Sequence, residues 1–173
     1  MIYPFICASL PALTPAQIPE MSLAEFDGLM KDELSEKLFE RMLYWDNGQS
    51  GVKVYDEMRR FQEYLRFRTG LMRAEKLNRQ VNFAEPDEFY GEVDHALAPA
   101  LSATPLEREK IVDAACWRKL DDLETGHDLD FEYLCIYRIR LQMLQKYAGR
   151  SEGAGRENFE AALEKLAEQF NEQ

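Results

Sequence analysis

The chain has 173 residues, of which 46% are hydrophobic and 31% are charged, and its formal net charge is −11 at pH 7. This length and mixture suit one globular domain or two small lobes and exclude a disordered chain. The net charge argues against binding to nucleic acids or anionic membranes, because their phosphate groups would repel the protein.

The cysteines and apolar runs indicate where the protein resides. Cys7, Cys116 and Cys135 are an odd number of thiols at wide spacing, as expected in a reducing compartment. The apolar start has no basic flank, and no run approaches the length of a membrane span. We expect a soluble, cytoplasmic protein without direct membrane insertion.

The N-terminal third is predicted to pass from an extended segment into helix. Residues 3–10 are β-prone or small, and prolines between residues 11 and 19 predict an extended connector. Ser22 and Glu25 form a capping box, and apolar residues at steps of three and four predict a helix to residue 42, bent or split at 32–35.

Two helices are predicted in the middle of the chain. A long one spans Val52 to Asn78, and Gly70 inside it indicates close packing or a bend. A shorter helix starts near Glu85 and ends near Pro99.

A second capping box, from Thr104 to Glu107, starts a helix that should reach Thr125, with Gly126 as its left-handed cap. The helix from Asp130 to Ala148 is apolar on most of its circumference, so it should be buried on several sides.

The C-terminal part is predicted to be a linker, residues 150–155, followed by a helix at 156–173 with one apolar stripe. We therefore expect an all-α fold: a domain at 1–149 with six to seven helices in an irregular bundle and a short extended N-terminal segment.

The chain resembles itself at an offset of 70 residues. Phe67 matches Tyr137, Arg68 matches Arg138 and Leu71 matches Leu141. Either two related lobes, 1–80 and 81–149, each contain one long helix, or two core helices share the same period without being related.

Both histidines follow a glutamate by three residues, in the pairs Glu92–His95 and Glu124–His127. Glu-x-x-His pairs bind di-iron centres in helical bundles. Here Gly126 interrupts the second pair and Pro99 ends the helix after the first, so capping or hydrogen-bonded histidines are favoured over metal ligands. No metal, cofactor or catalytic residue is expected, since no nucleophile elbow or phosphate-binding loop is present.

Basic and acidic residues are separated along the chain. Residues 59–79 contain seven basic and two acidic side chains, whereas residues 85–94 contain five acidic and no basic ones. Pairing between these segments is favoured over a surface that binds a partner, although aromatic residues alternate with the arginines as they do at interfaces. The interface candidates are Arg68, Arg138, His127, Phe67 and Tyr137.

Several blocks resemble an uncharacterised bacterial family encoded among genes for V-type ATPase subunits. The start resembles its Y-x-F-x-x-A-S-L-P opening, and Ser22, Leu23, Glu25 and Phe26 resemble its first helix. Residues 117–127 and 137–144 resemble its W-x-x-L-D-x-L-x-x-x-H and Y-x-x-x-L-Q-x-L blocks. In the block at residues 117–127, we expect Trp117, Leu120 and Leu123 to lie in the core. From the following helix, we expect Phe131 and Leu141 in the core as well.

The resemblance implies a non-catalytic subunit or assembly factor of a V-type ATPase that contacts other subunits and lies peripheral to the membrane. The paired long helices also resemble those of the C (or d) subunit, which seats the central stalk on the rotor ring. The alternatives are a free-standing helical adaptor and a di-iron carboxylate enzyme. The pattern indicates no oligomeric state.

Overall fold

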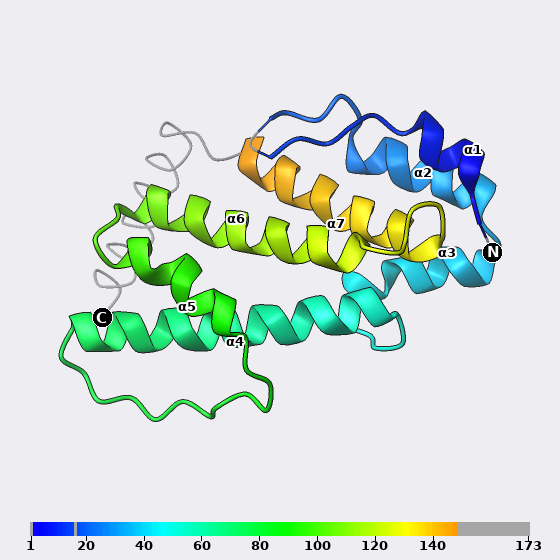
Figure 1. Cartoon of the computed structure of the whole chain (residues 1–173). Coiled ribbons are helices and arrows are strands. Elements are labelled where there is room, and N and C mark those ends of the chain that lie inside the picture. The colour runs from blue at the N-terminus through cyan, green and yellow to red at the C-terminus, as the bar shows by residue number, and fades with distance from the viewer. Residues whose placement is uncertain (1, 16, 149–173) are drawn as a thin grey trace, which may run out of the picture.

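The computed structural model describes residues 2–15 and 17–148, and in this part of the chain all regular elements are helical (Figure 1). The predicted all-α fold is confirmed. In chain order the elements are α1 (Pro4–Ser9), α2 (Leu23–Glu33), α3 (Glu36–Met42), the 3₁₀ turn η1 (Leu43–Trp45), α4 (Lys53–Lys76), α5 (Gly91–Leu97), the 3₁₀ turn η2 (Ala98–Leu101), α6 (Pro105–Glu124) and α7 (Phe131–Ala148).

Local signals place most helix ends. The Ser22 hydroxyl accepts a hydrogen bond from the Glu25 backbone N–H, and Thr104 does the same for Glu107, so both capping boxes are formed. Helix α2 ends where the sequence predicted a split, because Leu34 has an extended backbone. Gly126 has a φ of 91°, the left-handed conformation expected after α6.

The N-terminal segment is extended on both sides of a short helix that the sequence pattern did not predict. Ile2 forms an isolated antiparallel bridge with Asp130, and the Tyr3 N–H donates to the Leu129 carbonyl at 2.6 Å. Pro4 then occupies the first turn of α1, where its missing N–H costs nothing. The β-prone composition of residues 3–10 had pointed to extended backbone there.

Helix α5 also begins later than predicted, at Gly91 instead of near Glu85. The 14-residue connection between α4 and α5, residues 77–90, is non-helical and runs back along α4 (Figure 1). The Phe83 ring lies 3.1 Å from the position that a Cβ on Gly70 would occupy. This contact is the close packing that the glycine in α4 indicated.

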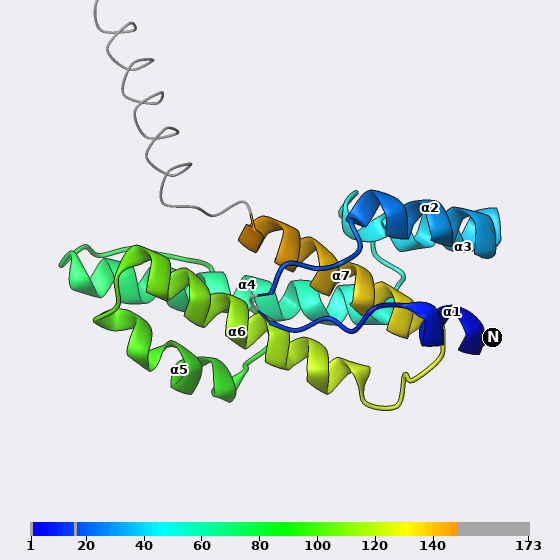
Figure 2. The same cartoon turned by 90° about the horizontal axis from the view of Figure 1, so that it is seen from above.

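Helix α4 spans most of the length of the molecule, with α2 and α3 near its start and α5 near its end (Figures 1 and 2). Helices α6 and α7 lie beside each other, and α7 also contacts α2 and α4. Every residue from Leu134 to Ile139 is buried, so α7 is enclosed on several sides, as predicted.

One hydrophobic cluster contains residues from both predicted lobes. Leu120, Phe131 and Leu141 are buried in it, and Leu123 is half-buried against it. Trp117 differs from the expectation, because it is half-buried and its ring lies 5.4 Å from the Arg140 guanidinium.

The predicted linker (150–155) and C-terminal helix (156–173) lie outside the described residues. Within the described ranges, none of the helices combines the length and the apolar composition needed to cross a membrane.

Candidate functional site

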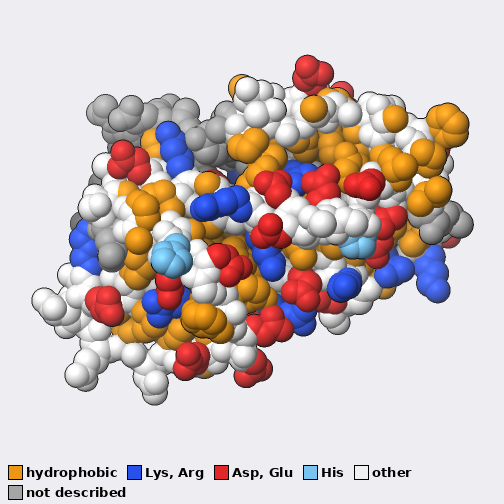
Figure 3. All heavy atoms as spheres, in the orientation of Figure 1, with side chains coloured by type: hydrophobic (Ala, Val, Ile, Leu, Met, Phe, Trp, Pro, Cys, Tyr) orange, Lys and Arg blue, Asp and Glu red, His pale blue; other side chains and the backbone are white. Residues whose placement is uncertain are grey.

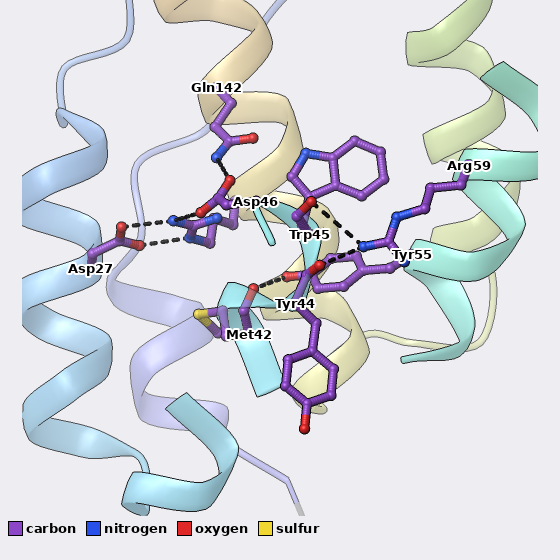
Figure 4. Close-up of polar contacts among 9 residues, drawn as sticks. Asp27, Met42, Tyr44, Trp45, Asp46, Tyr55, Arg59 and Gln142 are labelled. Carbon is purple, nitrogen blue, oxygen red and sulfur yellow. Dashed lines mark hydrogen bonds and ion pairs between the residues drawn. The ribbon is translucent and has the colours of Figure 1, made fainter. Parts of the chain in front are cut away.

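The most deeply buried charge in the described chain is the guanidinium of Arg138 on α7, which is 2% exposed. Its Nε and Nη2 donate to the two carboxylate oxygens of Asp27 on α2 at 2.7 and 2.8 Å, and Nη2 also lies 2.8 Å from Asp46 Oδ2. Gln142 donates to the other oxygen of Asp46 at 2.7 Å (Figure 4). The arginine therefore joins three segments that are distant in sequence.

The charges of this cluster stabilise one another. Burial alone would lower the pKa of Arg138, but its bonds to Asp27 and Asp46 outweigh burial and raise the pKa above its ordinary value. Burial alone would raise the pKa of Asp46, yet the bonds from Arg138 and Gln142 hold it below its usual value. Arg138 and Asp46 are consequently both charged near neutral pH.

Two further bonds fix the turn that contains Asp46. The Tyr55 hydroxyl, buried on α4, donates to the Met42 carbonyl at 2.8 Å. Arg59 donates to the Tyr44 carbonyl, and its guanidinium lies 5.5 Å from the centre of the Trp45 ring (Figure 4). This network is internal to the fold, so it positions α2 and η1 on α7 and leaves little charge available to a partner.

The basic residues of α4 separate into two groups. Arg60 Nε lies 3.0 Å from Glu88, and Arg68 Nε lies 2.6 Å from Asp94 on α5, so the predicted pairing of the basic and acidic segments is confirmed for these two. Arg66 and Arg73 on α4, and Arg79 in the connection that follows it, are exposed and form no ion pair with a described residue. Exposed arginines without an ion pair to a described residue therefore occur in the C-terminal half of α4 and just beyond it.

Apolar side chains are exposed beside these arginines. Four of the nine large hydrophobic residues that are exposed in the described chain belong to the connection between α4 and α5. We call these four the apolar strip: Leu77, Val81, Phe83 and Phe89. Hydrophobic side chains are visible in this region, toward the lower left of Figure 3.

The apolar strip follows one side of α4. Phe83 covers Gly70, and Phe89, which is 75% exposed, packs edge-on against Tyr64 at 5.7 Å between ring centres. Beyond Gly70, a hollow of about 440 Å³ lies between α4 and the start of α6, and it is lined by Arg66, Arg73 and Arg108 among other residues. Gly70, which the Phe83 ring covers, also lines this hollow, so one aromatic residue of the strip lies next to Arg66 and Arg73.

The five interface candidates are not brought together. Arg138 and Tyr137 are buried, and the Tyr137 hydroxyl donates to the Pro11 carbonyl at 2.9 Å. Phe67 and Arg68 are half-buried on α4, whereas His127 lies in the connection between α6 and α7. The apolar strip was missed in the sequence, although Val81 and Phe83, which lie between the two expected helices, were a visible signal.

The two Glu-x-x-His pairs do not form a common site in the described chain. Glu92 and His95 are exposed on α5, and Glu124 pairs with Arg140. The two histidines appear as separate pale-blue areas in Figure 3.

One group in the described chain has spacing compatible with a metal ion: His127, Asp130 and Glu132, whose nearest donor atoms lie within 4.8 Å of one another. His127 Nδ1 lies 2.7 Å from Asp130 Oδ2, and Asp130 Oδ1 accepts the backbone N–H of Tyr133. One carboxylate oxygen of Asp130 thus caps α7 and the other contacts His127, so both oxygens have partners within the protein.

The thiols are poor nucleophiles. Burial raises the pKa of Cys116 and of Cys135 to about 12, and burial also raises the pKa of Cys7. At neutral pH all three therefore remain protonated, whereas cysteine catalysis requires the thiolate.

Comparisons of the chain with protein-family models, with curated proteins and with solved structures found no match.

Proposed function

We propose that the protein works by contact with another protein, as a non-catalytic subunit or assembly factor of a bacterial V-type ATPase, and that the apolar strip is its contact surface. The observation that carries the proposal is the exposure of Phe83 and Phe89 along α4, with Phe83 packed at Gly70 between the positions of Arg66 and Arg73. Large apolar residues exposed side by side are unusual on a monomer, and aromatic residues with arginine are enriched where proteins bind one another.

The choice of partner rests on the sequence resemblance described above, which links the chain to V-type ATPase genes. The strip supports a protein partner of any kind. A free-standing adaptor would use the same surface, and only the identity of the bound protein separates the two functions.

Purification of the tagged full chain from its own host tests the choice of partner. We expect V-type ATPase subunits to be recovered with the bait. Recovery of a different protein at a fixed ratio would support the adaptor, and recovery of the bait alone would contradict both functions.

A further inference from the structure

A second hollow lies between α6, α7 and the connector that precedes α2, and it has a volume of about 240 Å³. Five uncharged residues line it, Pro15, Ala114, Trp117, Met143 and Leu144, together with two charged ones, Lys110 and Asp113. Trp117 is only half-buried, so part of its indole remains accessible. We call this hollow the α6–α7 groove.

The chain leaves the described structure beside this groove. Leu144 lies four residues before Ala148, where α7 ends, which is about 6 Å of helix. Residues 149–173, 25 residues in all, follow the end of α7 in the sequence. The groove is therefore close to the start of the remaining chain.

The sequence of that remaining part has one apolar face. Large apolar residues recur at steps of four, three and four, the spacing of one side of a helix: Phe159, Leu163, Leu166 and Phe170. Glu157, Glu164 and Glu168 fall on the opposite side at this spacing. Such a segment needs an apolar surface on one side and water on the other.

We propose that residues 156–173 bind back onto the same chain and insert Phe159 and Leu163 into the α6–α7 groove. The seven intervening residues, 149–155, include three glycines and can span about 23 Å when extended. A tether this short creates an effective concentration in the millimolar range, which favours the segment's own chain over a second copy. The contact does not depend on the ATPase partner proposed above.

Disulfide trapping in the full chain tests the contact. Leu163→Cys is combined with Ala114→Cys in the groove or, as a control, with Asp122→Cys, which is also exposed on α6. The native thiols are buried, so they compete poorly. We expect the Ala114 pair to form an intramolecular disulfide about tenfold faster than the Asp122 pair, read as a faster-migrating monomer on a non-reducing gel.

Equal rates for the two pairs would overturn the proposal. Disulfide-linked dimers would also overturn it, since they would place the segment on a second copy.

A second comparison tests the apolar insertion. In the Ala114→Cys, Leu163→Cys chain, Phe159→Asp should slow disulfide formation to the rate of the Asp122 pair, because the substitution removes the aromatic ring that packs against the apolar residues of the groove and puts a carboxylate in its place. Glu164→Gln, on the opposite side of the segment, should leave the rate unchanged. An unchanged rate with Phe159→Asp would show that the apolar face does not mediate the contact.

Discussion

Removal of the Asp27 carboxylate should cost much of the stability of the fold. Asp27 accepts two of the bonds from Arg138, which is 2% exposed, and Nη1 of this arginine has no hydrogen-bond partner among the described residues. In Asp27→Ala, the buried guanidinium would retain only Asp46, whose side chain is 40% exposed.

The expected loss follows from the burial of the pair. Breaking a buried ion pair by removing one partner costs about 3 to 5 kcal/mol, because the other charge stays buried. Asp46 still compensates part of the charge and Asp27 is itself 25% exposed, so we expect the lower end, about 3 kcal/mol. For a chain of this size the melting temperature should fall by roughly 6 to 12 °C.

Urea denaturation followed by circular dichroism measures the loss, and Asp32→Ala is a matched control. Asp32 lies on the same helix and is exposed, so its removal should change the free energy of unfolding by less than about 0.5 kcal/mol. If Asp27→Ala lost no more stability than Asp32→Ala, the Arg138 cluster would not stabilise the packing of α2 on α7.

Three further results are expected. Folding lowers the pKa of Asp46 from an ordinary value near 3.9, so the stabilisation from its carboxylate is present above about pH 4 and is lost as the pH falls through the folded-state pKa. The difference in unfolding free energy between the parent and Asp46→Asn should therefore shrink between pH 7 and pH 3. A constant difference would contradict this. Arg68→Ala should cost no more than about 1 kcal/mol in thermal melts, because the pair with Asp94 is partly exposed, and a larger loss would show that the pair is a core contact. Elemental analysis of the purified chain should find no stoichiometric iron, manganese or zinc, since His127 and Asp130 contact each other and Asp130 also caps α7. One bound metal per chain, lost in His127→Ala, would contradict that explanation.

Features that depend on neighbouring residues could be predicted from the sequence. The capping boxes at Ser22 and Thr104 and the turn at Gly126 involve partners within a few residues, so their spacing is visible in the chain. The burial of α7 was predictable for the same reason, because its apolar residues cover more than one side of the helix.

Contacts between distant segments could not be read in this way. Arg138 was an interface candidate in the sequence, and nothing near it indicates Asp27, which is 111 residues away. At the start of the chain, two local signals disagreed. The β-prone composition of residues 3–10 indicated an extended backbone, whereas Pro4 is a residue suited to the first turn of a helix, and the helix is what forms. The apolar strip was overlooked because it lies in a connection, where no periodicity marks its residues as one surface.

The central claim is that the apolar strip holds a protein partner, and matched phenylalanine variants test it most directly. Phe89 is 75% exposed in the strip, and Phe5 is 90% exposed on α1. In purifications of the tagged chain from its own host, Phe89→Ser should recover at least about tenfold less of the bound protein than the parent, as expected when an aromatic residue at the centre of an interface is removed. Phe5→Ser should recover as much as the parent. Full recovery with Phe89→Ser and loss with Phe5→Ser would contradict the account and move the contact surface to the N-terminal end of the molecule.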